Sequence, residues 1–527
     1  GIKLGMLLVF FAVMVGIGLY CRKHATDVSG FVLGGRSVGP WLTAFAYGTS
    51  YFSAVVFVGY AGQFGWKYGI AATWAGIGNA ILGSLLAWVV LGRRTRIMTQ
   101  HLDSATMPEF FGKRFGSRSL KVAASVIIFI FLIPYTASLY NGLSRLFGMA
   151  FDIDYSVCVV VMAVLTGVYV IAGGYMATAI NDFIQGIIMI FGIVAVIAAV
   201  LNSQGGFLAA LEGLAQVSDP EVSAAPGVFA SFFGPDPLNL LGVVVLTSLG
   251  TWGLPQMVQK FYAIKSEKAI DTGTVISTLF AVIVAGGCYF LGGFGRLFAD
   301  RMEVVNGVPV GGYDAVIPTM LSGLPDLLMA VVVILVLSAS MSTLSSLVLA
   351  SSSTLTLDFL KDNIIRNMDE KKQVSIMRGL IVVFIAISVV LANYISRYYH
   401  QMRKFKYGFV YPILVIAVFC GLIYLEHHMS CTILIFLIGA SLMWAGGSNW
   451  KLFAIGVGIV AAVAVLVVGI AVLALSAPAA GRRIQAFFRL CISMAGAGEN
   501  QAFSDGGALL KAFLEALVWC AGPLLGA

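Results

Sequence analysis

Hydroxyl side chains are concentrated in one long apolar stretch, residues 326–357. It contains the run Ser338-Ala339-Ser340-Met341-Ser342-Thr343-Leu344-Ser345-Ser346. On a helix, Ala339, Ser342 and Thr343 share one face. Hydroxyl and carbonyl oxygens coordinate hard cations such as Na⁺ without burying a formal charge, so this face is a candidate cation site. The alternative is structural, because small residues let helices pack closely and their hydroxyls bond back to their own helix.

Two other apolar segments, near residues 38–62 and 238–259, carry helix-weakening residues at their centres. The first contains Thr49-Ser50-Tyr51-Phe52-Ser53 and the second Gly250-Thr251-Trp252-Gly253-Leu254-Pro255. Unwound backbone exposes free carbonyls to cations, and inside a membrane it survives only where it faces protein or a watery cavity. Broken helices at corresponding places in two halves of a chain are typical of secondary transporters. If the hydroxyl-rich stretch 326–357 lies beside such a break, a cation site explains its hydroxyls better than close helix packing does.

Two charged residues within apolar stretches each have two interpretations. Asp182 lies at the start of a predicted span, where it could serve a cation path or cap the helix N-terminus. Arg145 lies near the end of another span, where it could meet a substrate carboxylate, but the snorkelling of a long side chain explains it better.

Aromatic and amide side chains near the two breaks predict a pocket of modest polarity. Such a pocket suits a small zwitterion or carboxylate better than a large lipid, and ordinary interhelical packing is the alternative. The candidate pocket residues are Tyr51, Phe52, Tyr135, Ser138, Trp252 and Gln256.

The composition indicates an all-α integral membrane protein, because 59% of the residues are hydrophobic and only 11% are charged. The first apolar stretch has no cleavage site after it, so we expect it to be a retained span. The seven scattered cysteines predict buried small side chains rather than disulfides or metal ligands. The predicted spans lie near residues 5–21, 39–62, 70–92, 119–149, 155–173, 182–202, 238–257, 270–296, 326–357 and 376–395.

The net charge of +8 is concentrated in short loops, so it predicts topology rather than nucleic-acid binding. Cytoplasmic loops carry an excess of Lys and Arg. By this rule residues 93–118, 259–268 and 359–378 are cytoplasmic, and residues 203–237 and 298–325 are external.

The spacing of the interrupted segments predicts two inverted repeats of five helices each, preceded by one extra N-terminal helix. The final helix of the second repeat should follow residue 396. The loop at 396–406 should then be external, yet it carries Arg397, Arg403, Lys404 and Lys406. Either this loop is a local exception to the charge rule, or the residues beyond about 393 do not continue the same architecture. We favour the second explanation, in which the last core helix is replaced by a segment of different origin.

Several motifs, in the right order, resemble the sodium/solute symporter family and within it most closely the proline and pantothenate permeases. The resemblance covers residues 1–392 and implies a LeuT-type fold in the bacterial inner membrane, with no enzymatic activity. The matching stretches are Phe31–Gly39, Thr49–Ser53, Gly173–Tyr175, Asn181–Gly186, Gly253–Gln256 and Met341–Ser345.

The resemblance implies Na⁺ as the coupling ion and a small organic solute as cargo, such as proline or pantothenate. The family's main sodium site carries over to the carbonyls of Thr49, Phe52 and Ala339 and the hydroxyls of Ser342 and Thr343. An aspartate on the family's inner cation path matches Asp182. Proline permeases have an aspartate where this chain has Tyr51, and the sugar-binding residues of glucose-type members find no match. These departures leave the solute open, and the oligomeric state is not predicted either.

The carboxyl-terminal part resembles a different family. Residues 403–452 contain the runs Arg403–Gly408, Leu425–Thr432 and Gly446–Trp450, which resemble part of the cell-shape and division peptidoglycan polymerases. We therefore expect a symporter-like domain at 1–392, a two-helix membrane segment at 393–475 and a tail at 476–527. The alternatives to a transporter are a membrane glycosyltransferase fragment of cell-wall synthesis and a non-functional composite chain.

Overall fold

The computed structural model describes residues 2–398 except 152–154, 220–221, 223–226, 306, 311 and 364–367. The described residues all belong to one compact unit. The predicted segments at 403–452 and 476–527, and the replaced last core helix, lie outside the described residues.

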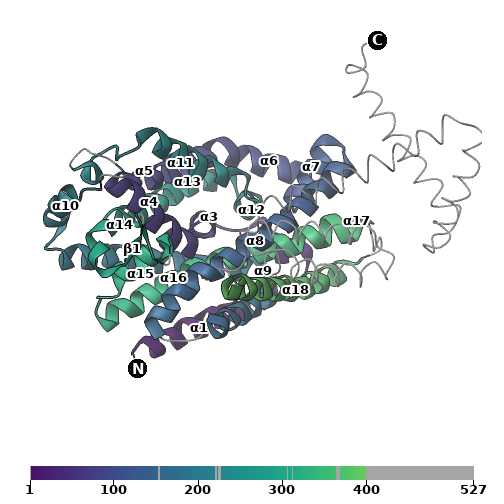
Figure 1. The fold of residues 1–527 in the computed structure, drawn as a ribbon. Coiled ribbons are helices and arrows are strands. Elements are labelled where there is room, and N and C mark those ends of the chain that lie inside the picture. The colour runs from purple at the N-terminus through teal and green to yellow at the C-terminus, as the bar shows by residue number, and fades with distance from the viewer. Residues whose placement is uncertain are drawn as a thin grey trace, which may run out of the picture. The chain divides into compact units, whose positions relative to one another are not determined.

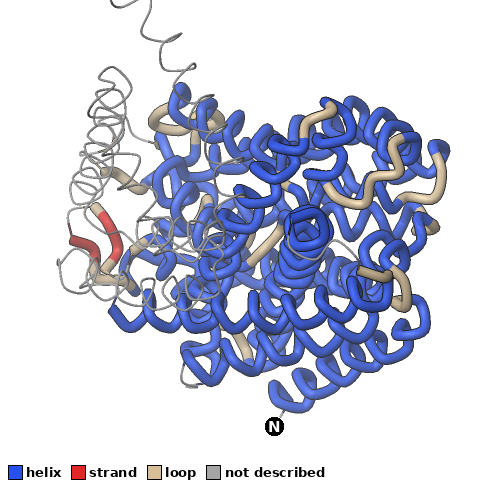
Figure 2. Tube along the Cα trace, turned by 90° about the vertical axis from the view of Figure 1, so that its right-hand side faces the viewer, coloured by secondary structure: helices blue, strands red, loops and turns tan. Residues whose placement is uncertain are grey.

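Helices dominate the described residues, together with one small hairpin (Figure 2). The hairpin pairs β1 (Val304–Val305) with β2 (Val308–Pro309) in antiparallel register. The longer helices are α1 (Ile2–Cys21), α3 (Pro40–Tyr51), α8 (Arg118–Phe151), α9 (Tyr155–Ser203), α11 (Pro237–Leu249), α13 (Glu267–Ala281), α16 (Asp326–Thr354) and α18 (Glu370–Tyr398).

Shorter helices connect and extend these. The α-helical ones are α2 (Val28–Leu33), α4 (Ala61–Tyr68), α5 (Thr73–Gly78), α6 (Arg93–His101), α7 (Met107–Phe115), α10 (Phe207–Gln216), α12 (Pro255–Ala263), α14 (Gly287–Gly292), α15 (Val316–Leu321) and α17 (Lys361–Asn363). The π-helical turns are η3 (Val55–Tyr60), η5 (Asn79–Leu85), η6 (Trp88–Gly92), η9 (Val282–Gly286) and η12 (Leu355–Leu360). The 3-10 turns are η1 (Arg22–His24), η2 (Gly34–Arg36), η4 (Gly69–Ala72), η7 (Val228–Ala230), η8 (Gly250–Gly253), η10 (Gly295–Arg301) and η11 (Tyr313–Ala315).

Both predicted helix breaks are confirmed. Helix α3 ends at Tyr51, and Phe52 is extended, with φ −77° and ψ 114°. In the second segment Leu254 is extended, with φ −72° and ψ 118°, and Pro255 begins α12. The two parts of this segment are bent by 51°. Proline starts a helix without cost because its missing N–H would be unpaired there, so the Leu-Pro sequence sets the position of the break.

The described residues contain six helices long and apolar enough to cross a membrane, or up to seven if the bent pair is one span. The chain is therefore a multi-pass membrane protein. Two spans expected at 155–173 and 182–202 are joined without a loop in α9, which changes direction at Gly174. The φ of +53° at Gly174 is favourable only for glycine, which explains how the chain turns there within a continuous helical stretch.

The helices form two groups that contact each other mainly through α3. In one group α3 packs against α12 and α13, and α11 packs against α5 and η5. In the other, α16 packs against α8, α9 and α18, with α1 beside them. Helix α3 also packs against α9 and α16, so the first break lies where the two groups face each other.

Loops predicted to be on the same side of the membrane do lie at the same end of the helices. Helix α12 packs against α6 and α7, and Thr106 at the start of α7 bonds to Asp358 of η12, whereas α10, α15 and the hairpin belong to the opposite end (Figure 1). The positively charged loops are therefore gathered at one end, as the charge rule predicts.

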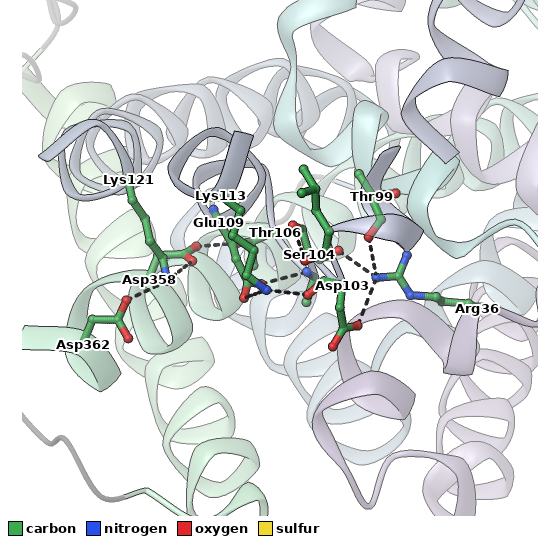
Figure 3. A network of polar contacts seen from close by, with 12 residues as sticks. Arg36, Thr99, Asp103, Ser104, Thr106, Glu109, Lys113, Lys121, Asp358 and Asp362 are labelled. Atoms are coloured by element: carbon green, nitrogen blue, oxygen red, sulfur yellow. Dashed lines mark hydrogen bonds and ion pairs between the residues drawn. The ribbon is translucent and has the colours of Figure 1, made fainter. Parts of the chain in front are cut away.

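A polar network ties the positively charged end together (Figure 3). Arg36 donates to the carbonyl oxygens of Ser104 at 2.8 Å and Tyr262 at 3.3 Å. Burial lowers the pKa of Arg36 from its ordinary value, and so does Arg96, but a guanidinium remains charged. Because its donors reach both α12 and the loop before α7, Arg36 holds these segments in register.

The same network fixes the end of α16. Asp358, in η12, is completely buried; it accepts a hydrogen bond from the Thr106 hydroxyl at 2.6 Å and pairs with Lys121 at 3.4 Å. Thr106 also caps α7, because its side chain accepts from the Glu109 amide at 3.2 Å. Lys121 in turn pairs with Asp362 at 2.7 Å (Figure 3). A single threonine therefore joins the start of α7 to the end of α16.

We predict that Thr106→Val destabilises the protein by about 2–4 kcal/mol, because it removes a helix cap and a hydrogen bond to a buried carboxylate. The measurement is the apparent melting temperature of the purified protein in detergent. Thr106→Ser keeps the hydroxyl and should melt close to the unchanged chain. Equal melting temperatures for the valine and serine variants would contradict this role.

Candidate functional site

The first break lies against the hydroxyl-rich helix α16. The Thr343 hydroxyl lies 3.2 Å from the carbonyl oxygens of both Thr49 and Phe52. The Ser342 hydroxyl lies 3.2 Å from the Thr49 carbonyl. Both hydroxyls also lie near the carbonyl of Ala339, at 3.1 Å from Ser342 and 3.0 Å from Thr343. Five oxygen atoms from two helices therefore meet at one point.

This oxygen cluster is closed off from solvent. Thr49, Ala339, Ser342 and Thr343 are completely buried, and Phe52 is 1% exposed. The break supplies the carbonyls, because Phe52 leaves the helical conformation and the amides of Val56 and Phe57 bond to the Ser53 carbonyl instead. Uncharged oxygens at this spacing suit a hard monovalent cation, so the cluster fits Na⁺.

Tyr169 fixes the position of α16 at this cluster. Its hydroxyl donates to the Met341 carbonyl at 3.1 Å, and the side chain is fully buried on α9. Sequence reasoning missed this contact because a single tyrosine within an apolar run carries no sign of its partner.

Asp182 does not cap a helix. It lies in α9 well beyond the turn at Gly174, with helical backbone on both sides, so the capping interpretation is wrong. The carboxylate is completely buried, and the ion pair that the structure shows for it is with Lys260 at 3.7 Å.

Lys260 was expected in the cytoplasmic loop at 259–268, but it lies within α12 and is only 2% exposed. Its placement is the main difference between the expected and observed sites. The sequence signal that could have indicated this was Pro255. A helix that starts at this proline includes Lys260, which is five residues later, within the packed region.

A small cavity adjoins the first break. Its volume is about 20 Å³, enough for roughly one water molecule, and it lies among α3, η5, η8, α12 and α13. Tyr51 and Phe52, two of the expected pocket residues, line it. Asn79 lines it as well and was not predicted; both polar atoms of its amide are buried without a hydrogen-bond partner in the described part of the chain.

The other expected pocket residues have varied positions. Gln256 is fully buried, and neither amide atom has a partner among the described residues. Trp252 is half-buried and donates to the Leu82 carbonyl at 2.8 Å. Tyr135 is half-buried and packs against the main core, together with Tyr51.

Ser138 is not at the cavity. Its side chain is exposed, and its hydroxyl bonds to the Tyr135 carbonyl of its own helix at 2.7 Å. The Arg145 side chain lies outside the part that the structure describes. Of the expected pocket set, the structure therefore brings Tyr51 and Phe52 to the cavity and leaves Ser138 away from it.

Comparison with known proteins gives two family matches. The model of the sodium:solute symporter family matches residues 31–423, which is further along the chain than the expected limit at 392. A second model, described as a cell cycle protein family, FTSW_RODA_SPOVE, matches residues 381–496 and overlaps the end of the first.

Relatives and solved structures agree with the first match. The chain is 30% identical over 374 residues to a sodium/proline symporter of Staphylococcus aureus (strain JH9), covering 70% of this chain and 69% of that protein. The same values hold for the protein of strain NCTC 8325 / PS 47.

Among solved structures, a Na⁺-coupled sialic acid symporter in a substrate-bound outward-open state is similar with a TM-score of 0.63 and 15% identity. That match covers 85% of this chain and 96% of the other. This likeness shows the fold, which is the LeuT-type fold of Na⁺-coupled symporters. With the family model matching most of the chain and sodium as the family's coupling ion, the chain belongs to the sodium:solute symporter family.

Proposed function

We propose that the chain couples the entry of Na⁺ to the uptake of a small organic solute by alternating access. The observation that carries this proposal is the meeting of five buried oxygens from Thr49, Phe52, Ala339, Ser342 and Thr343. Na⁺ bound there contacts both helix groups, because the first two residues lie at the break of α3 and the others on α16.

The cavity and the cation site share a residue, which supplies a route for coupling. The Phe52 carbonyl belongs to the oxygen cluster, and Phe52 also lines the cavity beside Tyr51. An ion that orders the backbone at Phe52 therefore also shapes the cavity. Because the residue is shared, Na⁺ binding changes the affinity for the solute, and solute binding changes the affinity for Na⁺ by the same factor.

The cavity lining supports a small solute recognised by neutral polar groups. Its polar lining includes the Tyr51 hydroxyl and the Asn79 amide, and no charged side chain is among its described lining residues. A solute carboxylate would then be balanced by the nearby Na⁺. We propose proline or a carboxylate such as pantothenate, and the sodium/proline symporter relatives support the first. The cavity must widen to admit either, as alternating access requires.

Asp182, Trp252 and Gln256 complete the proposed machinery, in the plasma membrane of a bacterium. Asp182 acts on the inner cation path. Gln256 offers a free amide beside the second break, and Trp252 holds that break against the Leu82 carbonyl. Tyr135 remains a predicted pocket residue.

The match to the cell cycle protein family supports a second candidate for the carboxyl-terminal part, a membrane glycosyltransferase of cell-wall synthesis. A lipid-II polymerisation assay on the full-length chain tests this candidate. Formation of polymer would support it, and absence of polymer together with Na⁺-driven uptake would remove it. Absence of both activities would favour a non-functional composite chain.

We predict that Ser342→Ala combined with Thr343→Ala raises the Na⁺ concentration for half-maximal uptake at least about tenfold. The change removes two of the five oxygens, and a contact to a charge is worth about 1.5 kcal/mol or more. Initial uptake rates in proteoliposomes at graded Na⁺ concentrations measure it.

The matched control is Ser352→Ala with Ser353→Ala on the same helix. Both of those hydroxyls are buried and bond only within their own turn, to the carbonyls of Leu349 and Ala350. The control should leave sodium activation unchanged. An unchanged activation curve for the Ser342 and Thr343 variant would remove the proposed sodium site.

We predict that proteoliposomes containing the full-length chain accumulate proline, pantothenate or a short monocarboxylate when an inward Na⁺ gradient is applied. Replacing Na⁺ with K⁺ should abolish accumulation, because the Na⁺ gradient is then no longer present to drive uptake. The readout is radiolabelled solute retained on filters. Failure of all three solute classes would refute the proposed substrate class.

We predict that Gln256→Met weakens solute binding several-fold while stability stays unchanged or rises. Its amide has no partner among the described residues, so its removal leaves no group unpaired. The measurements are the KM for solute and the melting temperature. Gln259→Met is the matched control, since it breaks a 3.0 Å hydrogen bond to the Val32 carbonyl and should lower stability instead. Unchanged KM in the first variant would exclude Gln256 from the solute site.

A further inference from the structure

Lys260 is a cationic side chain enclosed inside the helix bundle. It lies on α12, just after the second break, with 2% of its side chain exposed. Taking an ammonium group out of water is costly unless charge and hydrogen bonds compensate it. The groups around the Lys260 nitrogen therefore indicate what the lysine does.

Among the described residues, three groups lie close to the Lys260 ammonium. The Asp182 carboxylate lies 3.7 Å away, and the Ser346 hydroxyl accepts a hydrogen bond at 3.0 Å. The ring centroid of Tyr175 lies 5.0 Å away, within the range of a cation–π interaction. Asp182 and Tyr175 are on α9 and Ser346 is on α16, so the lysine joins one helix group to the other.

These contacts extend directly to the sodium cluster. Ser346 lies one helical turn, about 6 Å along the axis, from Ser342. The Ser346 hydroxyl also lies 2.9 Å from the hydroxyl of Ser50, which is next to Thr49 at the first break. A Na⁺ ion in the cluster and the Lys260 ammonium would thus be close neighbours of the same charge.

Asp182 is placed to remove this repulsion. It is completely buried, and neither of its oxygens has a hydrogen-bond partner among the described residues, so Lys260 is the partner that compensates its charge. The pair is neutral overall. Without Asp182, the unpaired ammonium would repel Na⁺ through a medium of effective dielectric constant about 20, where like charges roughly 6–10 Å apart weaken binding by roughly 10- to 100-fold.

We propose that the Lys260 ammonium is a fixed positive charge beside the sodium cluster. Asp182 assists Na⁺ binding by neutralising this charge rather than by coordinating Na⁺. This inference rests on the proposed sodium cluster. Because Lys260 belongs to α12 and its partners to α9 and α16, the ion pair also connects the two helix groups. Lys260 and Asp182 are positioning residues, since they act on the ion through charge.

The test measures binding of radiolabelled Na⁺ to the purified full-length chain, in three variants. Asp182→Asn leaves the ammonium unpaired and should weaken Na⁺ binding at least about tenfold. Asp182→Asn combined with Lys260→Met removes both charges and should restore binding to within about threefold of the unchanged chain. Lys260→Arg keeps the charge and should bind Na⁺ normally.

Lys268→Met is the matched control, because Lys268 is an exposed lysine on the next helix and should have no effect. If Asp182→Asn does not fold, the double variant still decides the matter, since it buries no unpaired charge. Normal Na⁺ binding by the double variant supports the proposal. A double variant that binds Na⁺ more than about threefold more weakly than the unchanged chain would overturn it, because Asp182 would then be a sodium ligand.

Binding by the unchanged chain separates this inference from the proposed function. If the unchanged chain binds no Na⁺, the sodium cluster itself is wrong. If it binds Na⁺ and loses binding after the Ser342 and Thr343 changes, the cluster stands, and the double variant alone decides the role of Lys260.

Discussion

The contact between the unwound backbone of α3 and the hydroxyls of α16 is the constraint on which the rest of the structure depends. Carbonyls freed by a broken helix cannot remain unpaired inside a membrane protein, because no water is present to satisfy them. The Thr49 and Phe52 carbonyls therefore face Ser342 and Thr343. Each hydroxyl can donate a hydrogen bond to these carbonyls. Its oxygen can also coordinate a cation together with the carbonyl oxygens. The same atoms thus stabilise the break and form the candidate sodium site.

Few charged side chains are buried in the described part of the chain, and the two buried carboxylates, Asp182 and Asp358, each have a cationic partner. Lys260 faces Asp182 across the two helix groups, and Asp358 faces Lys121 and Thr106 at the positively charged end. A buried ion pair contributes little net stability, but breaking one side of it is costly. Both pairs join elements that are distant in sequence. They are therefore suited to fixing how the helices are arranged rather than to strengthening any single helix.

The sequence predicted the local features well because their causes are local. The Leu-Pro step at Leu254 and the small polar run at Thr49 weaken a helix wherever they occur, and both breaks are present. The loop charges also predicted which loops lie together at one end of the helices. Local patterns did not predict which way a helix face points in the fold. Tyr135 and Ser138 share a helical face by spacing, yet Ser138 is exposed and bonds to its own helix.

The amino-acid sequence by itself determined the family, the multi-pass membrane character, the positions of the two breaks and the hydroxyl-rich face of α16. Hydropathy, helix-weakening residues and helical periodicity are properties of neighbouring residues, so they can be read without a fold. Only the tertiary structure decided that Lys260 is buried beside Asp182, that Asp182 lies inside a helix turned at Gly174, and that Asn79 reaches the cavity. These facts depend on how distant helices pack, because the partner residues lie far apart along the chain. The side chains become buried from water only when those helices come into contact.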